Sequence, residues 1–416
     1  MKKLSMRSKN CLRISVWTLA VALVLLAFIL IGIYLGTQQS IGNLLELEIT
    51  ELPSDARVVV DKTDKYLGHP DMVLTDGGEL ITMYPGSHGR GAIITKKSGD
   101  FGQTWSERLA DTPESWVNSQ ETPTLYKLEF LNGTSKILLV SGCPYWPGTS
   151  IKANGFNFSI SADDGTTWSE FENVYSPADC IVAMSSLTRL KENGSYVDKW
   201  MGTFHTHKFV NYKTVLSFDE NGKAHWSEPQ PLLAEHRKIE KSAAMCELEI
   251  IRGENEHSDT LILLARANSR RTNSLISVSR DEGNTWTKPV ELPYVLTGDR
   301  HKAEYDAESG RYVITFRSIV PPKSNALASD RLSAGWVGWI GTFDDLLSLA
   351  DGDKSNDRLG DAFIRFSVNY NGNDCGYSGI VIKDGLVCAV SYGYFDAEAE
   401  NPYILCVRFK PADYIN

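Results

Sequence analysis

Two carboxylate side chains interrupt an apolar stretch at residues 246–252, CELEIIR. Glu247 and Glu249 are two residues apart, so in a β-strand both side chains would point to the same face. A carboxylate that is buried without a hydrogen-bonding or charged partner is costly to the folded protein. The pattern therefore favours a functional glutamate over a carboxylate on a solvated strand face.

A glycine-rich loop at residues 84–91, YPGSHGRG, contains a histidine and an arginine. Its glycines lack a Cβ and let the backbone come close to a ligand. The imidazole of His88 titrates near neutral pH, so it can donate a proton as a carboxylic acid would. The guanidinium of Arg90 can hold an anion. His69 and Asp71, in LGHPDM, are further candidates for the same site.

A repeated motif indicates which elements position these groups. Ser-x-Asp-x-Gly-x-Thr-Trp begins at Ser98, Ser161 and Ser279, and a copy with one extra residue begins at Ser217. The step of roughly 60 residues fits about six times between residue 58 and the end of the sequence, as in propellers built from four-stranded blades. The segments between the copies are short, β-branched and bounded by turn residues, for example KILLVSG, TLILLAR and RYVITFR. The fold class predicted is all-β.

The motif itself is interpreted as structural rather than catalytic. Its aspartates, Asp100, Asp163 and Asp281, are expected to accept backbone N–H groups across a tight turn. The glycine two residues later suits a left-handed conformation, and the tryptophan can cover the turn with a large apolar ring. The motif therefore identifies the architecture and leaves the chemistry to other residues.

The motif resembles the Asp-box of sialidases (neuraminidases) and related bacterial neuraminidase-repeat proteins, and the likeness covers the chain from about residue 58 onwards. The resemblance implies a six-bladed β-propeller and a divergent bacterial subgroup of the superfamily. It also implies an exo-glycosidase of the exo-α-sialidase type, which removes a terminal acidic sugar with retention of configuration. Sialidases use a tyrosine nucleophile because a carboxylate on the anomeric carbon would repel a negatively charged one.

Site residues follow from the resemblance by position. Tyr377, in DCGYSGIV, takes the place of the nucleophile, and Glu247 takes the place of the group that accepts its proton. Arg266, at the end of TLILLAR, matches one of the arginines that bind the substrate carboxylate. A further arginine is implied in the fifth blade. The candidates for it are Arg331, Arg317 and Arg300.

The first blade departs from the sialidase pattern. Gly68 stands where sialidases carry an arginine, and the loop at residues 84–91 contains no carboxylate. We therefore expect His88 to act as the acid/base and Arg90 to replace the missing arginine. The departure leaves another ulosonic acid or a uronic acid open as the substrate, and Glu121 is a further residue that could line the site.

Two other classes of function remain open. The missing arginine and aspartate also suit a catalytically inactive propeller that binds glycans, and a structural propeller for protein partners is a weaker alternative. His205 and His207 are two residues apart, but no third metal ligand is evident, so no metal site is predicted. No organic cofactor is predicted, since phosphate-binding and dinucleotide-binding motifs do not occur.

The N-terminus predicts attachment to a membrane. Basic residues within residues 1–13 precede an uncharged run at residues 14–36, long enough to cross a hydrocarbon layer of about 30 Å. Because basic residues favour the cytoplasmic side, we expect a cytoplasmic segment, a transmembrane signal anchor over residues 14–36, a stalk over residues 37–57 and an extracytoplasmic propeller over residues 58–416. A cleaved signal peptide, which would release the propeller, is the alternative.

Charge and cysteine content narrow the partners of the 416-residue chain. The formal net charge of −10 disfavours nucleic acid as a partner. The expected partners are sialylated or other acidic glycans, held by local arginines, and the membrane through the N-terminal helix. The seven cysteines have no metal-binding spacing, and one pair could be oxidised in an exported domain.

Overall fold

The computed structural model describes residues 19, 21, 23–31, 49–144, 155–319, 335–352, 359–372 and 374–415. They belong to two units, residues 1–46 with 323–325 and residues 47–322 with 326–416. In the first unit every described residue is helical. Among the described residues, no helix has both the length and the apolar character needed to cross a membrane. The rest of the predicted anchor at residues 14–36, and the candidate Arg331, lie outside the described residues.

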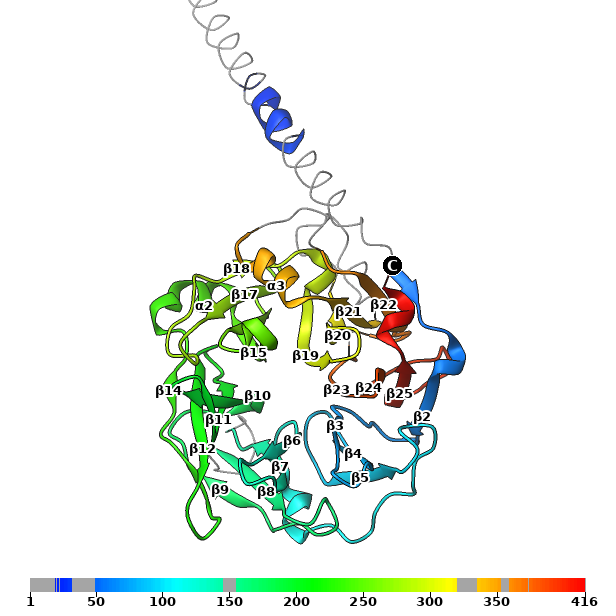
Figure 1. The fold of residues 1–416 in the computed structure, drawn as a ribbon. Coiled ribbons are helices and arrows are strands. Elements are labelled where there is room, and N and C mark those ends of the chain that lie inside the picture. The colour runs from blue at the N-terminus through cyan, green and yellow to red at the C-terminus, as the bar shows by residue number, and fades with distance from the viewer. Residues whose placement is uncertain are drawn as a thin grey trace, which may run out of the picture. The chain divides into compact units, whose positions relative to one another are not determined.

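The second unit is built from six sheets arranged around a common centre (Figure 1). Blade 1 contains β3 (Asp71–Leu74), β4 (Leu80–Pro85) and β5 (Ile93–Ser98). Blade 2 contains β6 (Thr124–Glu129), β7 (Ser135–Gly142), β8 (Phe156–Ser161) and β9 (Glu172–Val174). Blade 3 contains β10 (Ile181–Glu192), β11 (Ser195–His205), β12 (Asn211–Phe218), β13 (Ala224–Trp226) and β14 (Gln230–Pro231).

The remaining blades follow in sequence order. Blade 4 contains β15 (Met245–Arg252), β16 (Leu261–Ala267), β17 (Leu275–Ser279) and β18 (Val290–Glu291). Blade 5 contains β19 (Gly298–Asp306), β20 (Arg311–Ser318), β21 (Gly335–Gly341), β22 (Ala362–Ser367) and β1 (Ile49–Glu51). Blade 6 contains β23 (Ser378–Lys383), β24 (Leu386–Gly393), β25 (Tyr403–Phe409) and β2 (Arg57–Asp61).

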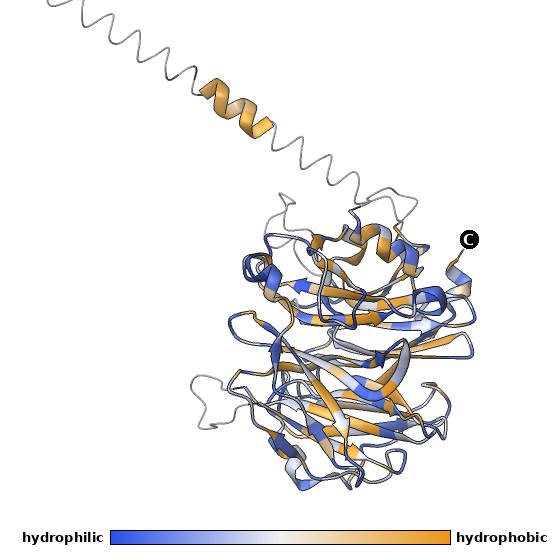
Figure 2. Ribbon diagram, turned by 60° about the vertical axis from the view of Figure 1, so that its left-hand side comes forward, coloured by the Kyte–Doolittle hydropathy of each residue, from blue (hydrophilic) through white to orange (hydrophobic). Residues whose placement is uncertain are grey.

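Helices are few and short in this unit. Its described α-helices are α2 (Arg237–Ala243) and α3 (Phe343–Ala350). The 3₁₀ turns among the described residues are η1 (Ser54–Ala56), η2 (Glu114–Asn118), η3 (Ala234–His236), η4 (Asn255–His257), η5 (Tyr294–Leu296) and η8 (Pro411–Tyr414). Hydrophobic and hydrophilic residues are mixed along the strands (Figure 2), and several strands, such as β4 and β21, are buried along their whole length. The all-β six-bladed propeller expected from the repeat is confirmed.

Strands from the start of the unit complete the last two blades. β2 pairs antiparallel with β25 and so supplies the outer strand of blade 6, while β1 pairs in parallel with β22 of blade 5. Leu52, between these two strands, is buried in the core shared by blades 5 and 6. The last residues of the predicted stalk at residues 37–57 are therefore part of the propeller, because their apolar side chains and backbone groups find partners there.

The three full copies of the repeated motif form the turns that the sequence predicts. Asp100 Oδ1 accepts the backbone N–H groups of Gln103 at 3.0 Å and Thr104 at 2.9 Å, and Oδ2 accepts the Thr104 hydroxyl at 2.6 Å. Asp163 and Asp281 each accept the equivalent threonine N–H and hydroxyl. The glycines of the three copies have φ values of +84°, +81° and +73°, in the left-handed region that favours glycine.

The tryptophans of the motif fill the cores between neighbouring blades. Trp105 packs in the core shared by blades 6 and 1, and Trp168 in the core shared by blades 1 and 2. Trp226 and Trp286 do the same between blades 2 and 3 and between blades 3 and 4. Each large ring removes apolar surface from water and ties one blade to the preceding one.

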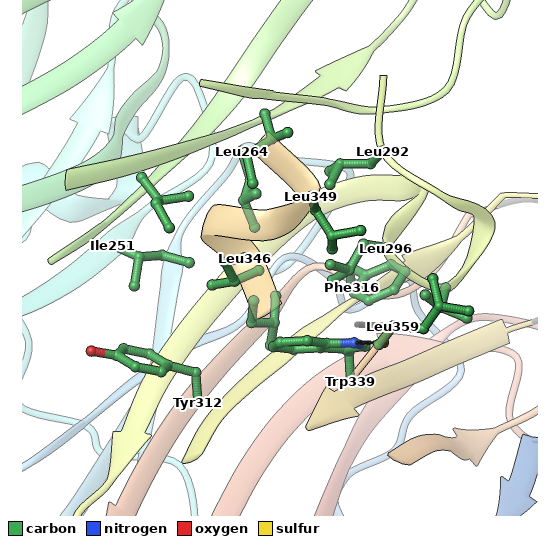
Figure 3. Packing of buried hydrophobic residues seen from close by; sticks show 14 of the residues in the cluster. Ile251, Leu264, Leu292, Leu296, Tyr312, Phe316, Trp339, Leu346, Leu349 and Leu359 are labelled. Atoms are coloured by element: carbon green, nitrogen blue, oxygen red, sulfur yellow. Dashed lines mark hydrogen bonds between the residues drawn. The ribbon is translucent and has the colours of Figure 1, made fainter. Parts of the chain in front are cut away.

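Between blades 4 and 5 a short helix takes the place of this tryptophan. α3 begins at a capping box in which the Thr342 hydroxyl accepts the Asp345 N–H and the Asp345 carboxylate accepts the Thr342 N–H. Its Leu346 and Leu349 point into the same buried cluster as side chains from both blades (Figure 3). The helix α3 therefore has the packing role between blades 4 and 5 that a tryptophan of the motif has between the earlier blades.

Candidate active site

A cavity of about 280 Å³ opens where the inner strands of the blades begin. The inner strands β3, β6, β10, β15, β19 and β23 contact one another in turn around the centre of the propeller. Their first residues therefore bring side chains from distant parts of the sequence to one place. The ionisable residues that line the cavity are His69, His88, Arg90, Glu121, Glu247 and Tyr377.

Irregular backbone aims some of these side chains. Val182, Glu247 and Arg300 have φ values of 51°, 51° and 54°, and each lies where the pairing register of an inner strand shifts. Non-glycine residues seldom adopt this left-handed conformation, which persists only where the surrounding structure imposes it. A bulge of this kind breaks the alternation of the strand and redirects the side chains near it.

Tyr377, Glu247 and Arg266 form one hydrogen-bonded group. The Tyr377 hydroxyl donates to Glu247 Oε1, which also accepts from Arg266 Nη1 at 2.6 Å. Arg266 Nη1 lies 3.1 Å from the Tyr377 hydroxyl oxygen. Burial and the adjacent Glu247 raise the pKa of Tyr377 well above its ordinary value. The phenol is thus protonated at rest, and its proton is directed at a carboxylate.

Three arginines converge on a single buried aspartate beside this group. Arg270 Nη1 and Nη2 donate to the two carboxylate oxygens of Asp299, each at 2.6 Å. Arg266 Nε lies 3.1 Å from Asp299 Oδ1, and Arg317 donates to Asp299 Oδ2 through Nε at 3.0 Å and through Nη2. Burial would raise the pKa of Asp299, but Arg266 and Arg317 hold it well below its ordinary value.

A second hydrogen-bond network near Tyr377 centres on Asp374. Its carboxylate accepts the hydroxyl of Tyr66 at 2.6 Å and that of Tyr392 at 2.5 Å, and it lies 3.1 Å from His88 Nδ1. The hydrogen bond with Asp374 raises the pKa of His88, against the opposing effect of partial burial. His88 Nε2 has no hydrogen-bond partner among the described residues, so this nitrogen can serve a substrate.

His69 lies between this network and Tyr377, with its ring centroid 4.8 Å from that of Tyr377. His69 Nδ1 accepts the backbone N–H of Gly89 at 2.9 Å, which places the ring proton on Nε2, 3.2 Å from the Tyr392 hydroxyl oxygen. Burial, followed by the nearby His88, lowers the pKa of His69 to about 3. His69 is therefore a neutral wall of the cavity.

The described residues contain one group with ligand atoms close enough to share a metal ion. These are His69, His88 and Asp374, whose ligand atoms lie within 4.8 Å of one another. To bind a metal through Nε2, His69 would need its proton on Nδ1, which faces the N–H donor of Gly89. The arrangement is thus better suited to hydrogen bonds than to a metal.

Glu121 is the second group in the cavity that can exchange a proton near neutral pH. Its carboxylate accepts the backbone N–H of Val182 at 2.7 Å and the Thr122 hydroxyl at 3.1 Å. Burial raises the pKa of Glu121 to about 7 despite these hydrogen bonds. The cavity therefore offers a carboxyl and an imidazole as possible acids.

Some of the residues expected at the site lie elsewhere. Asp71 accepts the backbone N–H groups of Met72 at 2.9 Å and Leu125 at 3.0 Å, so it joins blades 1 and 2. The buried Arg300 donates to the carbonyl oxygen of Ser185. Neither side chain lines the cavity: Asp71 is used between blades 1 and 2, and Arg300 links blade 5 to blade 3.

The remaining expectations can be placed in the same way. Glu249 is buried, and its Oε1 accepts the backbone N–H of Ala303 at 3.1 Å, away from the Tyr377 cavity. His205 is buried, and burial lowers its pKa to about 3, while His207 Nε2 lies 4.0 Å from Asp179. These histidines are not among the described residues that gather as possible metal ligands.

Sequence reasoning did not single out Asp299, Arg270, Asp374, Tyr66 or Tyr392. Asp299 directly precedes Arg300, and Asp374 lies three residues before Tyr377 in DCGYSG. Two sequence signals could have identified these aspartates: one lies close to a proposed nucleophile, and the other lies next to an arginine inside a predicted strand. Which partner each carboxylate binds depends on the local strand register, which the sequence does not reveal.

Comparison with known proteins agrees with this architecture. The BNR repeat-like domain family matches residues 108–386. No curated protein sequence matches the chain. A Dyadobacter fermentans protein of unknown function is 14% identical, with a TM-score of 0.58, over 85% of this chain and 97% of that one.

Two similar structures are enzymes. The intramolecular trans-sialidase from Ruminococcus gnavus is 12% identical, with a TM-score of 0.55, over 86% of this chain and 98% of its own. The α-L-arabinanase from Penicillium chrysogenum is 13% identical, with a TM-score of 0.54, over 86% of this chain and 99% of its own. At these identities the likeness establishes the fold alone. The chain belongs to the BNR repeat-like domain family, and it folds as a sialidase-like six-bladed β-propeller.

Proposed function

We propose that the propeller is a retaining exo-glycosidase in which Tyr377 is the nucleophile and Glu247 accepts its proton. The observation that carries the proposal is the hydrogen bond from the Tyr377 hydroxyl to Glu247 in the wall of the cavity. A phenol becomes a strong nucleophile only as its proton leaves, and Glu247 already receives that proton. Arg266 Nη1, 3.1 Å from the phenol oxygen, stabilises the negative charge that develops there.

The reaction proceeds in two displacements. First, the Tyr377 oxygen bonds to the anomeric carbon, its proton passes to Glu247, and the bond to the leaving oxygen breaks as His88 protonates that oxygen. Then water attacks the anomeric carbon and gives a proton to His88, the bond to Tyr377 breaks, and Glu247 returns its proton. A glycoside and water become a free sugar and an alcohol, and two inversions retain the configuration.

The ligand that we propose is a glycan that ends in an acidic sugar. Arg90 lines the cavity and forms no hydrogen bond or ion pair with the described residues. His88, whose pKa is raised by its hydrogen bond with Asp374, adds a second positive charge when protonated. With residues 14–36 as a membrane anchor, the propeller would meet such glycans outside the cytoplasm.

Glycan binding without catalysis is the second candidate function, and the Asp299 cluster favours it. The guanidinium groups of Arg266, Arg270 and Arg317 are already paired with Asp299, so they are poorly placed to grip a substrate carboxylate as well. The glycosidase would hydrolyse its ligand and the glycan-binding propeller would not, although both would use the same cavity.

A hydrolysis screen of the full-length protein tests the proposed activity. We expect release of the fluorophore from at least one fluorogenic acidic glycoside, and NMR spectra of the first product should show retained anomeric configuration. Glycan binding without hydrolysis of any glycoside in the panel would favour the inactive glycan-binding propeller.

The role of His88 predicts a shift in the pH profile of the Asp374→Asn variant. His88 must be protonated to donate a proton, so kcat/KM should fall as the pH rises through its pKa. The Asp374 carboxylate raises that pKa, so its removal should move the falling limb to lower pH and leave the rate at low pH largely unchanged. Asp374 acts through His88 and is thus a positioning residue.

The matched control for this profile is Glu121→Gln, which removes the other titrating acid of the cavity. If Glu121→Gln removes the falling limb while Asp374→Asn leaves it in place, Glu121 is the proton donor and the assignment to His88 is wrong. The pH dependence of kcat/KM for both variants, on one substrate, decides between the two acids.

A further inference from the structure

The guanidinium groups nearest to the nucleophile already bind a carboxylate of this chain. Arg266 contacts the Tyr377 hydroxyl oxygen through Nη1 at 3.1 Å and Asp299 Oδ1 through Nε at 3.1 Å. The guanidinium of Arg266 thus lies between the Asp299 carboxylate and the reacting oxygen of Tyr377. Its side chain is completely buried and is carried by β19, so it is a fixed part of the site.

The cluster has little remaining capacity for a second anion. Arg266 uses its other nitrogens on Glu247 at 2.6 Å and on Asn268 Oδ1 at 2.7 Å. Arg270 donates to Asp299 through both terminal nitrogens, and Arg317 donates to it through Nε and Nη2. Displacing Asp299 would leave a buried charge without partners, which is strongly unfavourable.

Because Asp299 already occupies these arginines, the site disfavours a substrate with a carboxylate on its anomeric carbon. For attack, that carbon must approach the Tyr377 oxygen to about 3–3.5 Å. In a glycoside of a 2-keto acid the carboxylate carbon is bonded directly to the anomeric carbon and lies only about 1.5 Å from it. That carboxylate would come close to Arg266, where it would meet Glu247 and Asp299, two carboxylates that repel it.

Unpaired positive charge lies in the blade 1 loop instead. Arg90 has no partner among the described residues, and His88 offers its free Nε2. We propose, on the basis of the proposed glycosidase function, that the substrate is an aldoside: its anomeric carbon bears hydrogen, and its carboxylate is attached elsewhere on the ring, as in a uronic acid. Arg90 then meets the carboxylate, away from the carbon that Tyr377 attacks, and His88 Nε2 stays free to protonate the leaving oxygen.

A ligand pair that differs only in the carboxylate tests this inference with the full-length protein. The probes are the 2,3-dehydro derivative of N-acetylneuraminic acid and its methyl ester, measured by titration calorimetry. For the wild type we expect the acid to bind no more tightly than the ester, and weak binding by both agrees with this. Binding of the acid at least about tenfold tighter than the ester would overturn the proposal.

The Asp299→Asn variant supplies a gain of binding, because it removes the internal anion and keeps the size of the side chain. We expect the acid to bind this variant at least about tenfold more tightly than the wild type. An unchanged affinity in the folded variant would show that the cluster does not discriminate against the carboxylate, contrary to the proposal. If the variant does not fold, the acid-to-ester ratio of the wild type still decides.

Hydrolysis separates this inference from the proposed function. Fluorogenic uronosides should be hydrolysed, and the matching N-acetylneuraminide should not. Arg90→Gln should raise KM for a uronoside at least about tenfold and change KM little for the corresponding neutral glycoside. Turnover of the N-acetylneuraminide would overturn the substrate assignment alone. Failure to hydrolyse any glycoside would count against the glycosidase function alone. In that case the ratio of the acid and ester affinities would still test the substrate assignment.

Discussion

Tyr377→Phe is expected to lower kcat by on the order of 10³-fold or more on any glycoside that the wild type hydrolyses. The variant lacks the oxygen that would bond to the anomeric carbon and the proton that Glu247 would accept. The ring itself is retained, so the contact with His69 at 4.8 Å between centroids and the shape of the cavity should persist. Ligand affinity should therefore change little, which single-turnover kinetics and calorimetry can establish together.

Tyr84→Phe is the matched control for this experiment. Tyr84 is also buried, and its hydroxyl also donates to a carboxylate, Asp61 Oδ2, at 2.7 Å. It does not line the cavity, so its removal should affect stability but not kcat. Equal losses of kcat in both variants would point to a general disturbance of the propeller. An unchanged kcat in Tyr377→Phe would rule out the tyrosine as the nucleophile.

The architecture could be predicted from the sequence because the repeated motif is local. The turn around Asp100 is formed by residues within a few positions of one another, so its hydrogen bonds and its glycine follow from the motif itself. The position of Trp105 between blades follows from the six-fold period. The helix α3 did not follow, because it fills the same kind of gap with different residues.

The site was only partly predictable. The resemblance to sialidases suggested Tyr377, Glu247 and Arg266, and the structure brings these three side chains into contact. The partner of Arg266 on its other side, Asp299, was not foreseen, because it depends on the register shift between Asp299 and Lys302. A one-residue shift in an inner strand decides whether a side chain faces the cavity or the wall between blades.

Asp71 and Arg300 were likewise misplaced by sequence reasoning. Both were candidates for substrate binding on grounds of charge and sequence position. In the structure both charges hold blades together: Asp71 joins blades 1 and 2 through the Leu125 N–H, and Arg300 links blade 5 to blade 3 through the Ser185 carbonyl. Charged residues at the start of inner strands thus serve two purposes, and sequence position alone does not distinguish them.

Asp299→Ala should destabilise the propeller by about 3–5 kcal/mol, the range found when one partner of a buried ion pair is removed. Arg266 and Arg317, both largely buried, would be left with excess positive charge and mutual repulsion beside the half-buried Arg270. The free energy of unfolding, measured by urea denaturation of the full-length protein, provides the test.

The exposed ion pair between Asp396 and Lys62, with oxygen and nitrogen 2.8 Å apart, gives the matched comparison. Asp396→Ala should cost less than about 1 kcal/mol, because both groups remain solvated when the pair is lost. If Asp299→Ala costs no more than this, Asp299 does not neutralise the arginines. The origin of a larger loss can be tested further: adding acetate should partly restore the stability of Asp299→Ala, since an anion that binds only the folded cluster stabilises it by mass action. If the loss of stability came only from the cavity left by the missing side chain, acetate would not restore it.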